Sequence, residues 1–161
     1  MVPIIALLLC LFLVSSIFVA GCAKKEKEEV IKIGAILPLT GNVAFWGQPV
    51  QKGMEFAAKE INSKGGINGK KIELRIEDSK GDATEGVIAL NKLLNIDKVL
   101  TVSVHTTAVS NAVAPILEEN KVPWIANAAD PGLPLTYKYA FKTFYNAYDE
   151  CKKLIMDLKK E

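Results

Sequence analysis

The sequence predicts an α/β fold, a three-layer open parallel sheet with helices on both faces. Two observations support this prediction. Apolar runs of strand length recur along the chain, and the segments between them repeat their hydrophobic residues with the spacing of a helix face. Strands that alternate with helices favour a parallel sheet that is covered on both sides. With 161 residues, 50% of them hydrophobic, the chain is long enough for about one such domain.

The first 21 residues are predicted to be a secretion signal rather than part of this domain. From Val2 to Ala20 the chain carries no charged side chain, and the stretch ends in small residues. The sequence VAGC at residues 19–22 resembles the lipobox of a secreted lipoprotein, which is cleaved before a cysteine that then carries lipid. We therefore expect Cys22 to be lipidated and to anchor the protein at the extracytoplasmic face of the cell membrane. The alternative is an uncleaved anchor, since the apolar run is nearly long enough to span a bilayer.

Residues 22–29 are predicted to form a charged tether, and the folded domain is expected over residues 30–145. Its first strand is the apolar run VIKIGAIL, residues 30–37. A helix is predicted from Gln48 to Ser63 because its apolar residues share one face, and these are Val50, Met54, Ala57, Ala58 and Ile61. The turn GGINGKK ends this helix, and KIELRIED, residues 71–78, alternates like a half-buried strand.

The second half of the domain continues the alternation of strand and helix. Asp82 followed by Glu85 has the spacing of a capping box, and the helix it begins is predicted to reach about Leu94. Three further elements follow, a buried strand over residues 98–104, a helix over 107–120 and a fourth strand over 122–126.

Four loops follow the predicted strands, with the sequences PLTGNVAFWGQ, SKGD, HTT and NAADPGLP. Because ligands of open parallel sheets bind beyond the carboxyl ends of the strands, these loops form the predicted ligand edge. The first loop carries two adjacent rings. We expect Phe45 to pack near the edge of the sheet and Trp46 to face a ligand side chain.

Composition and motifs argue against a nucleic-acid-binding protein and against an enzyme. The formal net charge is only +2, and no basic run is interleaved with aromatic residues. The stretch GGINGK lacks the spacing of a phosphate loop and lies at the wrong end of the sheet. His105 is the only histidine, and the sequence places no catalytic partner beside it. We expect no catalytic residue, no cofactor, no metal and, with Cys151 the only cysteine in the domain, no disulfide framework.

The third and fourth loops offer complementary binding groups. A helix that begins near Thr106 and Thr107 presents free backbone N–H groups and hydroxyls to a carboxylate. The fourth loop offers the backbone carbonyls of Ala128 and Ala129 and the carboxylate of Asp130, which suit an ammonium group. Together with an apolar wall at the first loop, these groups describe an α-amino acid with a hydrophobic side chain. Each also has a simpler interpretation as a helix cap, a turn or a cover for the sheet.

The segment IKIGAILPLTGNVAFWGQPVQKGMEFAAKEINSKGGINGKKIELRIEDSKGD resembles the first lobe of the leucine/isoleucine/valine-binding proteins. These are type I periplasmic solute-binding proteins of ABC transporters, with flavodoxin- or Rossmann-like lobes. The resemblance implies an extracytoplasmic receptor that traps an amino acid between two lobes and delivers it to an ABC permease. It also implies that Trp46 covers the ligand, that Thr107 and nearby N–H groups hold its carboxylate, and that Ala128 and Ala129 contact it. Asp130 stands where the family has a threonine, so it is expected to pair with the ammonium more strongly or to select another amine or amide.

Members of this family have two lobes and more than twice this length. The resemblance implies a crossing to the second lobe after residues 141–144, and residues 146–161 are predicted to form an amphipathic helix that begins it. The sequence therefore predicts a truncated first lobe that keeps about half of a micromolar site, or roughly millimolar affinity. The alternative is a single-lobe sensory or interaction lipoprotein that associates with another copy or chain through this helix, whose apolar face comprises Cys151, Leu154, Ile155 and Leu158.

Overall fold

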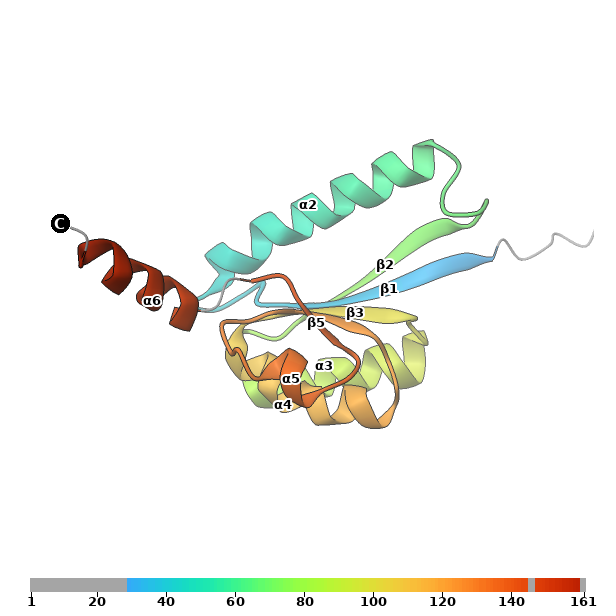
Figure 1. The fold of residues 1–161 in the computed structure, drawn as a ribbon. Helices are drawn as coiled ribbons and strands as arrows, with labels where there is room; N and C mark the ends of the chain where they lie inside the picture. Colours follow the sequence, from blue (N-terminus) through green and yellow to red (C-terminus); the bar gives the residue numbers. More distant parts are fainter. Residues whose placement is uncertain (1–28, 145–146, 160–161) are drawn as a thin grey trace, which may run out of the picture.

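The computed structural model describes residues 29–144 and 147–159, which form a parallel five-stranded sheet with helices on both faces (Figure 1). The predicted α/β fold is confirmed. The strand order is β2-β1-β3-β4-β5, so β2 and β3 lie on opposite sides of β1. The strands are β1 Val30–Leu37, β2 Lys71–Asp78, β3 Thr101–His105, β4 Trp124–Asn127 and β5 Ala140–Lys142. The helices are α2 Ala44–Ser63, α3 Ala83–Lys92, the π-helix η1 Leu93–Asp97, α4 Thr107–Glu119, α5 Leu133–Thr136 and α6 Ala147–Leu158.

The strands show how far the sequence pattern determines the sheet. β1 and β2 have the predicted bounds and pair in register along their whole length. β3 begins at Thr101 rather than at residue 98, because η1 extends the preceding helix and Lys98 leaves it with a left-handed φ of 57°. The three-residue strand β5 was not predicted as an element. It pairs with β4 and completes the sheet.

Helix α2 begins at Ala44, four residues before the predicted start. Phe45 and Trp46 therefore lie in its first turn and not in a loop. The expectation that Phe45 packs near the sheet edge is wrong, since its side chain is 64% exposed. The first turn is pressed onto the end of β1 instead through Gly47, where an added Cβ would lie 2.1 Å from the carbonyl oxygen of Pro38. Sequence periodicity contains no signal for such a tertiary contact.

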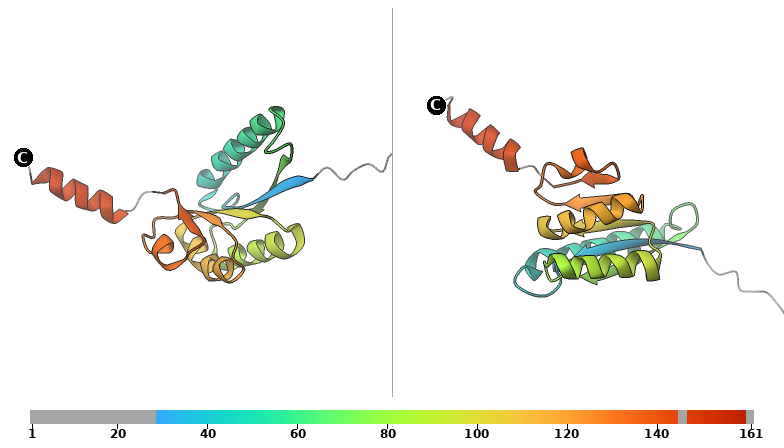
Figure 2. Two further views of the ribbon diagram at one scale, coloured as in Figure 1. Left: turned by 45° about the vertical axis from the view of Figure 1, so that its right-hand side comes forward. Right: turned by 90° about the horizontal axis from the view of Figure 1, so that it is seen from below.

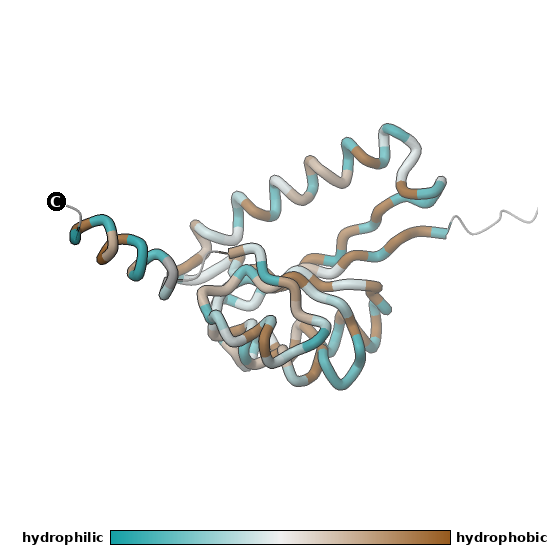
Figure 3. The backbone as a smooth tube through the Cα atoms, in the orientation of Figure 1, coloured by the Kyte–Doolittle hydropathy of each residue, from teal (hydrophilic) through white to brown (hydrophobic). Residues whose placement is uncertain are grey.

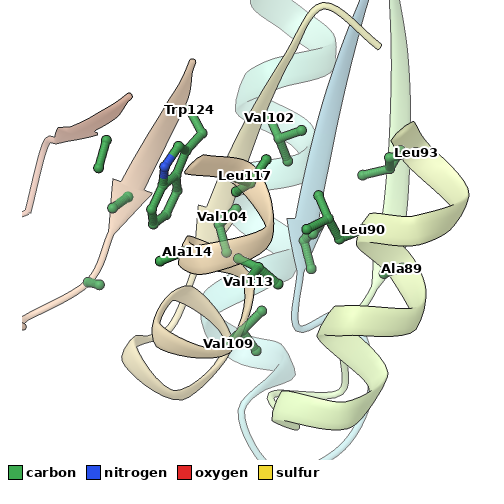
Figure 4. Close-up of a cluster of buried hydrophobic side chains, with 14 of the residues drawn as sticks. Ala89, Leu90, Leu93, Val102, Val104, Val109, Val113, Ala114, Leu117 and Trp124 are labelled. Atoms are coloured by element: carbon green, nitrogen blue, oxygen red, sulfur yellow. The ribbon is translucent and has the colours of Figure 1, made fainter. Parts of the chain in front are cut away.

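The hydrophobic core lies between the sheet and helices α3, α4 and α5 (Figures 1 and 4). Val102, Val104 and Trp124 are fully buried there, and α4 contributes Val109 and Leu117 from the opposite layer. The other face of the sheet is covered differently. Among the described elements, α2 alone lies on it, over β1 and β2 (Figure 2). The described helices therefore cover more of one side of the sheet than of the other.

Helix α6 projects away from the sheet at the carboxyl ends of the strands (Figures 1 and 2). Its hydrophilic and hydrophobic residues alternate along the helix, as they also do in α2 (Figure 3). Within residues 29–144 and 147–159, no helix is both long and apolar enough to cross a membrane. The predicted signal, the lipidation site Cys22 and the domain boundary near residue 145 lie outside the described residues.

Candidate functional site

A cavity of about 390 Å³ opens at the carboxyl edge of the sheet, where the topology predicts a ligand. This volume is in the range of small-molecule sites. It lies between the start of α2 and the start of α4, beside the carboxyl ends of β1, β3 and β4. Its lining residues are Pro38, Trp46, Val50, His105, Thr106, Thr107, Asn127, Ala128, Ala129 and Phe144.

The start of α4 forms the polar wall of this cavity. Thr106 precedes the helix with φ 76° and ψ 144°, a strained conformation for a residue other than glycine. No side chain caps the helix, and Thr106 Oγ1 is buried without a hydrogen-bond partner in the described part of the chain. The first N–H groups of a helix have no intrahelical acceptor, and the helix dipole favours negative charge there. This wall is therefore suited to an anionic group.

Thr107 joins the third loop to the fourth. Its Oγ1 accepts a hydrogen bond from the backbone N–H of Ala129 at 3.1 Å. An hydroxyl group that accepts one bond still has its own hydrogen to donate. Thr107 therefore fixes the fourth loop and keeps a donor for a ligand oxygen.

Asp78, at the end of β2, holds the first loop in place. Its Oδ1 accepts hydrogen bonds from the N–H groups of Leu39 at 2.8 Å, Thr40 at 3.3 Å and Lys80 at 2.8 Å, and its Oδ2 accepts from the Thr40 hydroxyl. Burial by itself raises the pKa of this carboxyl, but these hydrogen bonds outweigh it and hold the pKa below its ordinary value. Asp78 thereby positions the loop that leads into α2.

The apolar wall comes mainly from α2. Trp46 and Val50 lie about one turn apart in α2, and both line the cavity. Trp46 is 62% exposed, and the centroid of its ring lies 5.2 Å from that of Phe45 in a tilted arrangement. Phe144 contributes a second ring to the cavity. Hydrophobic side chains therefore line the same cavity as the uncapped start of α4.

His105 and Asn127 occupy paired positions at the ends of β3 and β4. His105 Nε2 lies 3.2 Å from the hydroxyl oxygen of Ser103. Burial lowers the pKa of His105, so its ring is neutral at physiological pH. His105 is thus the last residue of β3, has a hydrogen-bonding neighbour in Ser103 and lines the cavity.

Asp130 is the predicted site residue that the structure does not bring to the cavity. Its Oδ1 accepts from the N–H of Gly132 at 2.7 Å and its Oδ2 accepts from Asn111 Nδ2 at 3.0 Å. The residue borders a separate hollow between α4 and α5. The expected pairing of Asp130 with a ligand ammonium is not supported, because turn formation directs the carboxylate elsewhere. The sequence also predicted that the carbonyl of Ala129 accepts from the ligand ammonium. In the structure, Lys142 Nζ donates to this carbonyl oxygen at 3.4 Å.

The structure brings the other five predicted residues to one cavity, namely Trp46, Thr106, Thr107, Ala128 and Ala129. That they bind a ligand stays a prediction. Sequence reasoning missed Val50, Asn127 and Phe144 as lining residues. The sequence could have indicated Asn127, since it is the first residue of the NAADPGLP segment that follows the fourth predicted strand. Within the described ranges, no three His, Cys, Asp or Glu side chains gather closely enough to hold a metal ion.

An open parallel sheet with a cavity at its carboxyl edge, lined by apolar side chains and by the uncapped start of a helix, is the architecture of an α/β solute-binding lobe. The family model of the periplasmic binding proteins matches residues 30–161. The chain therefore belongs to the periplasmic binding protein family. Proteins of this family are extracytoplasmic solute-binding proteins rather than enzymes.

Individual relatives agree with this assignment. Leu/Ile/Val-binding protein homolog 3 of Brucella melitensis is 40% identical over 99 residues, which are 62% of this chain and 27% of that protein. The structure of LivJ, a branched-chain amino acid transporter substrate-binding protein from Streptococcus pneumoniae in complex with isoleucine, matches with a TM-score of 0.69. It is 34% identical, over 72% of this chain and 34% of LivJ.

A third relative is a solute-binding protein of an ABC transporter from Rhodopseudomonas palustris in complex with 3,4-dihydroxy benzoic acid. It matches with a TM-score of 0.67 and 25% identity, over 73% of this chain and 32% of that protein. The chain thus spans about a quarter to a third of the length of the relatives that it matches.

Proposed function

We propose that this lobe forms one wall of an amino-acid site in a solute-binding protein of an ABC importer, and that its ligand is a branched-chain amino acid. The observation that carries the proposal is the start of α4. There the buried Thr106 hydroxyl, the Thr107 hydroxyl and uncapped N–H groups converge on the cavity that holds Trp46. Relatives that bear the name Leu/Ile/Val-binding protein, and LivJ in complex with isoleucine, support the same ligand class.

The two walls of the cavity fix how the ligand would lie. The α-carboxylate receives hydrogen bonds from the N–H groups at the start of α4 and from Thr107 Oγ1, because this end carries the positive helix dipole. The aliphatic side chain then points toward Trp46 and Val50, which remove its apolar surface from water. The ammonium lies near the carbonyl of Ala128, since Asp130 is engaged in its own turn.

One wall alone gives weak binding. A micromolar site is worth about −8 kcal/mol, and a lobe that supplies half of this free energy keeps about −4 kcal/mol, which corresponds to roughly millimolar affinity. Trp46 is the most exposed residue of this wall, with 62% of its surface accessible. A second wall that closed on the ligand would therefore bury more apolar surface at Trp46 than at any other residue of this wall.

A nuclear magnetic resonance titration with L-leucine and with L-leucinamide tests the proposal. Leucinamide keeps the side chain and the amine but lacks the carboxylate. We expect saturable shifts at Thr106, Thr107 and Ala129 with leucine in the millimolar range, and at least about tenfold weaker shifts with leucinamide. Equal shifts with both compounds would contradict the carboxylate site, and the absence of saturable shifts would contradict the ligand class.

The membrane attachment of this protein is part of the same proposal. Lipid on Cys22 would hold the lobe at the outer face of the cell membrane, close to an ABC permease as its partner. The support is the charge-free run from Val2 to Ala20 and the VAGC sequence. Membrane fractionation of cells that express wild-type protein and the Cys22→Ala variant is the test. Release of the variant from the membrane is expected, and equal retention of both proteins would favour an uncleaved anchor.

A further inference from the structure

Asp130 is tied to the helix beside the fourth loop, and it borders the hollow between α4 and α5 rather than the ligand cavity. Its Oδ2 accepts a hydrogen bond from Asn111 Nδ2 at 3.0 Å, and its Oδ1 accepts from the N–H of Gly132 at 2.7 Å. Asn111 lies about one turn after Thr107 in α4. One side of α4 therefore holds two consecutive residues of the loop, Ala129 and Asp130.

The first of these bonds sets the direction of the peptide group between Ala128 and Ala129. A trans peptide group is planar, and its N–H and C=O point in opposite directions. Because the N–H of Ala129 donates to Thr107 Oγ1 at 3.1 Å, the carbonyl of Ala128 is directed away from α4. This carbonyl is the acceptor that we assigned to the ligand ammonium, so a role for its direction rests on the proposed function.

A single hydrogen bond leaves this peptide group free to pivot, since hydrogen-bond angles at an oxygen acceptor have a broad distribution. Two further contacts remove that freedom. Lys142 Nζ donates to the carbonyl of Ala129 at 3.4 Å, and Asn111 holds the next residue, Asp130. The fourth loop is thus held from β5 and from α4 at adjacent points of the chain.

We propose that Asp130 is a positioning residue of the amino-acid site. Held by Asn111, it keeps the carbonyl of Ala128 directed at the ligand ammonium, and it does not touch the ligand itself. The role belongs to the hydrogen bonds of the carboxylate and not to its charge. Asp130→Asn therefore preserves it, because an amide oxygen still accepts from Gly132 and the amide of Asn111 can present either its nitrogen or its oxygen.

Three variants separate the effect of position from the effect of charge. Asn111→Asp sets a second carboxylate against Asp130 and breaks the hydrogen bond. Asp130→Asn removes the charge but keeps the bond. The double variant, which combines both changes, again places an amide donor opposite a carboxylate. Asn91→Asp, at an exposed residue of α3, is the matched control for an added negative charge.

In a nuclear magnetic resonance titration with L-leucine, Asn111→Asp should bind about threefold or more weakly than wild type. Asp130→Asn, the double variant and Asn91→Asp should stay within about twofold of wild type. A direct contact between Asp130 and the ammonium predicts the opposite order, because Asp130→Asn would then lose affinity and Asn111→Asp would gain it. That order, or wild-type binding by Asn111→Asp, would overturn the proposal.

The compound 4-methylpentanoate, which is leucine without its amine, shows which end of the site responds. Asn111→Asp should bind it within about twofold of wild type, since the carboxylate is assigned to the start of α4. A loss of affinity that is equal for leucine and 4-methylpentanoate would indicate general damage to the lobe and would count against a positioning role.

The backbone amide of Ala129 reports on the loop without any ligand. Its hydrogen exchange should be at least about threefold faster in Asn111→Asp than in wild type, and the double variant should return to within about twofold of wild type. Unchanged exchange in Asn111→Asp would refute the positioning role. Failure of the proposed function has a different signature, because wild-type protein would then show no saturable shifts with leucine while the effect on the Ala129 amide persists.

Discussion

At the scale of single residues, the candidate site depends on threonine hydroxyls whose surroundings are set by distant parts of the chain. Thr107 serves two purposes, because it accepts a bond from Ala129 and lies at the start of α4. Thr106 is held with a positive φ, and its hydroxyl has no partner within the described residues. A strained residue with an unused buried hydroxyl is typical of a site that completes its hydrogen bonds with a ligand.

The Thr107→Val variant isolates this hydroxyl. Valine keeps the shape of threonine but neither accepts from Ala129 nor donates to a carboxylate, so the titration slope with L-leucine should fall about tenfold. Thr136→Val, on the exposed helix α5, is the control and should retain the wild-type slope. Wild-type binding by the Thr107 variant would remove the hydroxyl from the site.

Asp78 should contribute measurably to stability. The Asp78→Asn variant loses the charge that four donors share, and urea unfolding should show a loss of about 1–3 kcal/mol. Asp82→Asn is a close control, because Asp82 caps α3 through Thr84 and Glu85 and asparagine caps a helix equally well. If both variants unfold at the same urea concentration as wild type, Asp78 does not hold the first loop.

The same carboxylate predicts a pH dependence of folding. The folded-state pKa of Asp78 lies below the value of about 3.9 expected in the unfolded chain. The unfolded state therefore binds more protons in this range, and stability rises with pH. The contribution is fully present above the unfolded pKa and is lost as the pH falls through the folded pKa. Urea unfolding between pH 5 and pH 2 should show a flatter pH dependence for Asp78→Asn than for wild type.

At the scale of elements, α2 shows why a helix can begin where its periodicity does not. The apolar repeat of the sequence starts only after Gln48, yet the helix starts at Ala44 because Gly47 allows its first turn to touch Pro38. The close contact moves Trp46 from a loop to a rigid helix end. The position of Trp46 in the apolar wall therefore depends on Gly47, because a side chain at residue 47 would collide with Pro38.

A pair of glycine substitutions in α2 tests this contact. Gly47→Ala should destabilise the lobe by about 2 kcal/mol or more, since the new Cβ meets backbone that cannot move freely. Gly53→Ala in the same helix meets nothing within 4 Å and should stabilise by about 0.5–1 kcal/mol. Thermal unfolding of both variants provides the comparison, and equal effects would show that the Gly47 contact is unimportant.

The same elements show what sequence alone determines. The alternation of strand and helix predicted the sheet. The bounds of β1 and β2 were predicted to the residue, because a long apolar pattern specifies a strand whatever packs against it. The strand β5 is too short for a repeat to be recognised. The role of Asp78 was missed because Leu39, one of its partners, is 39 residues away in sequence. Asp130 was placed wrongly because a turn residue bonds its own backbone first.

At the scale of the whole molecule, stability is expected to be uneven. The face between the sheet and α4 holds fully buried side chains, whereas the described side chains of α6 are exposed. Amides of elements with few buried contacts exchange through local opening, and core amides exchange near the global limit. Hydrogen exchange in α6 should therefore be at least about 100-fold faster than in α4. Equal protection of the two helices would show that α6 packs on its own sheet.

The two tryptophans of this lobe lie in opposite surroundings. Trp124 is fully buried in the core, and Trp46 is 62% exposed at the cavity. Fluorescence from the two rings should therefore respond differently to iodide, which reaches only accessible indoles. Emission that resists the quencher reports the integrity of the fold, and the quenchable part reports the occupancy of the cleft. The natural chain thus carries two internal optical probes, and Trp46→Phe would separate their signals without a dye.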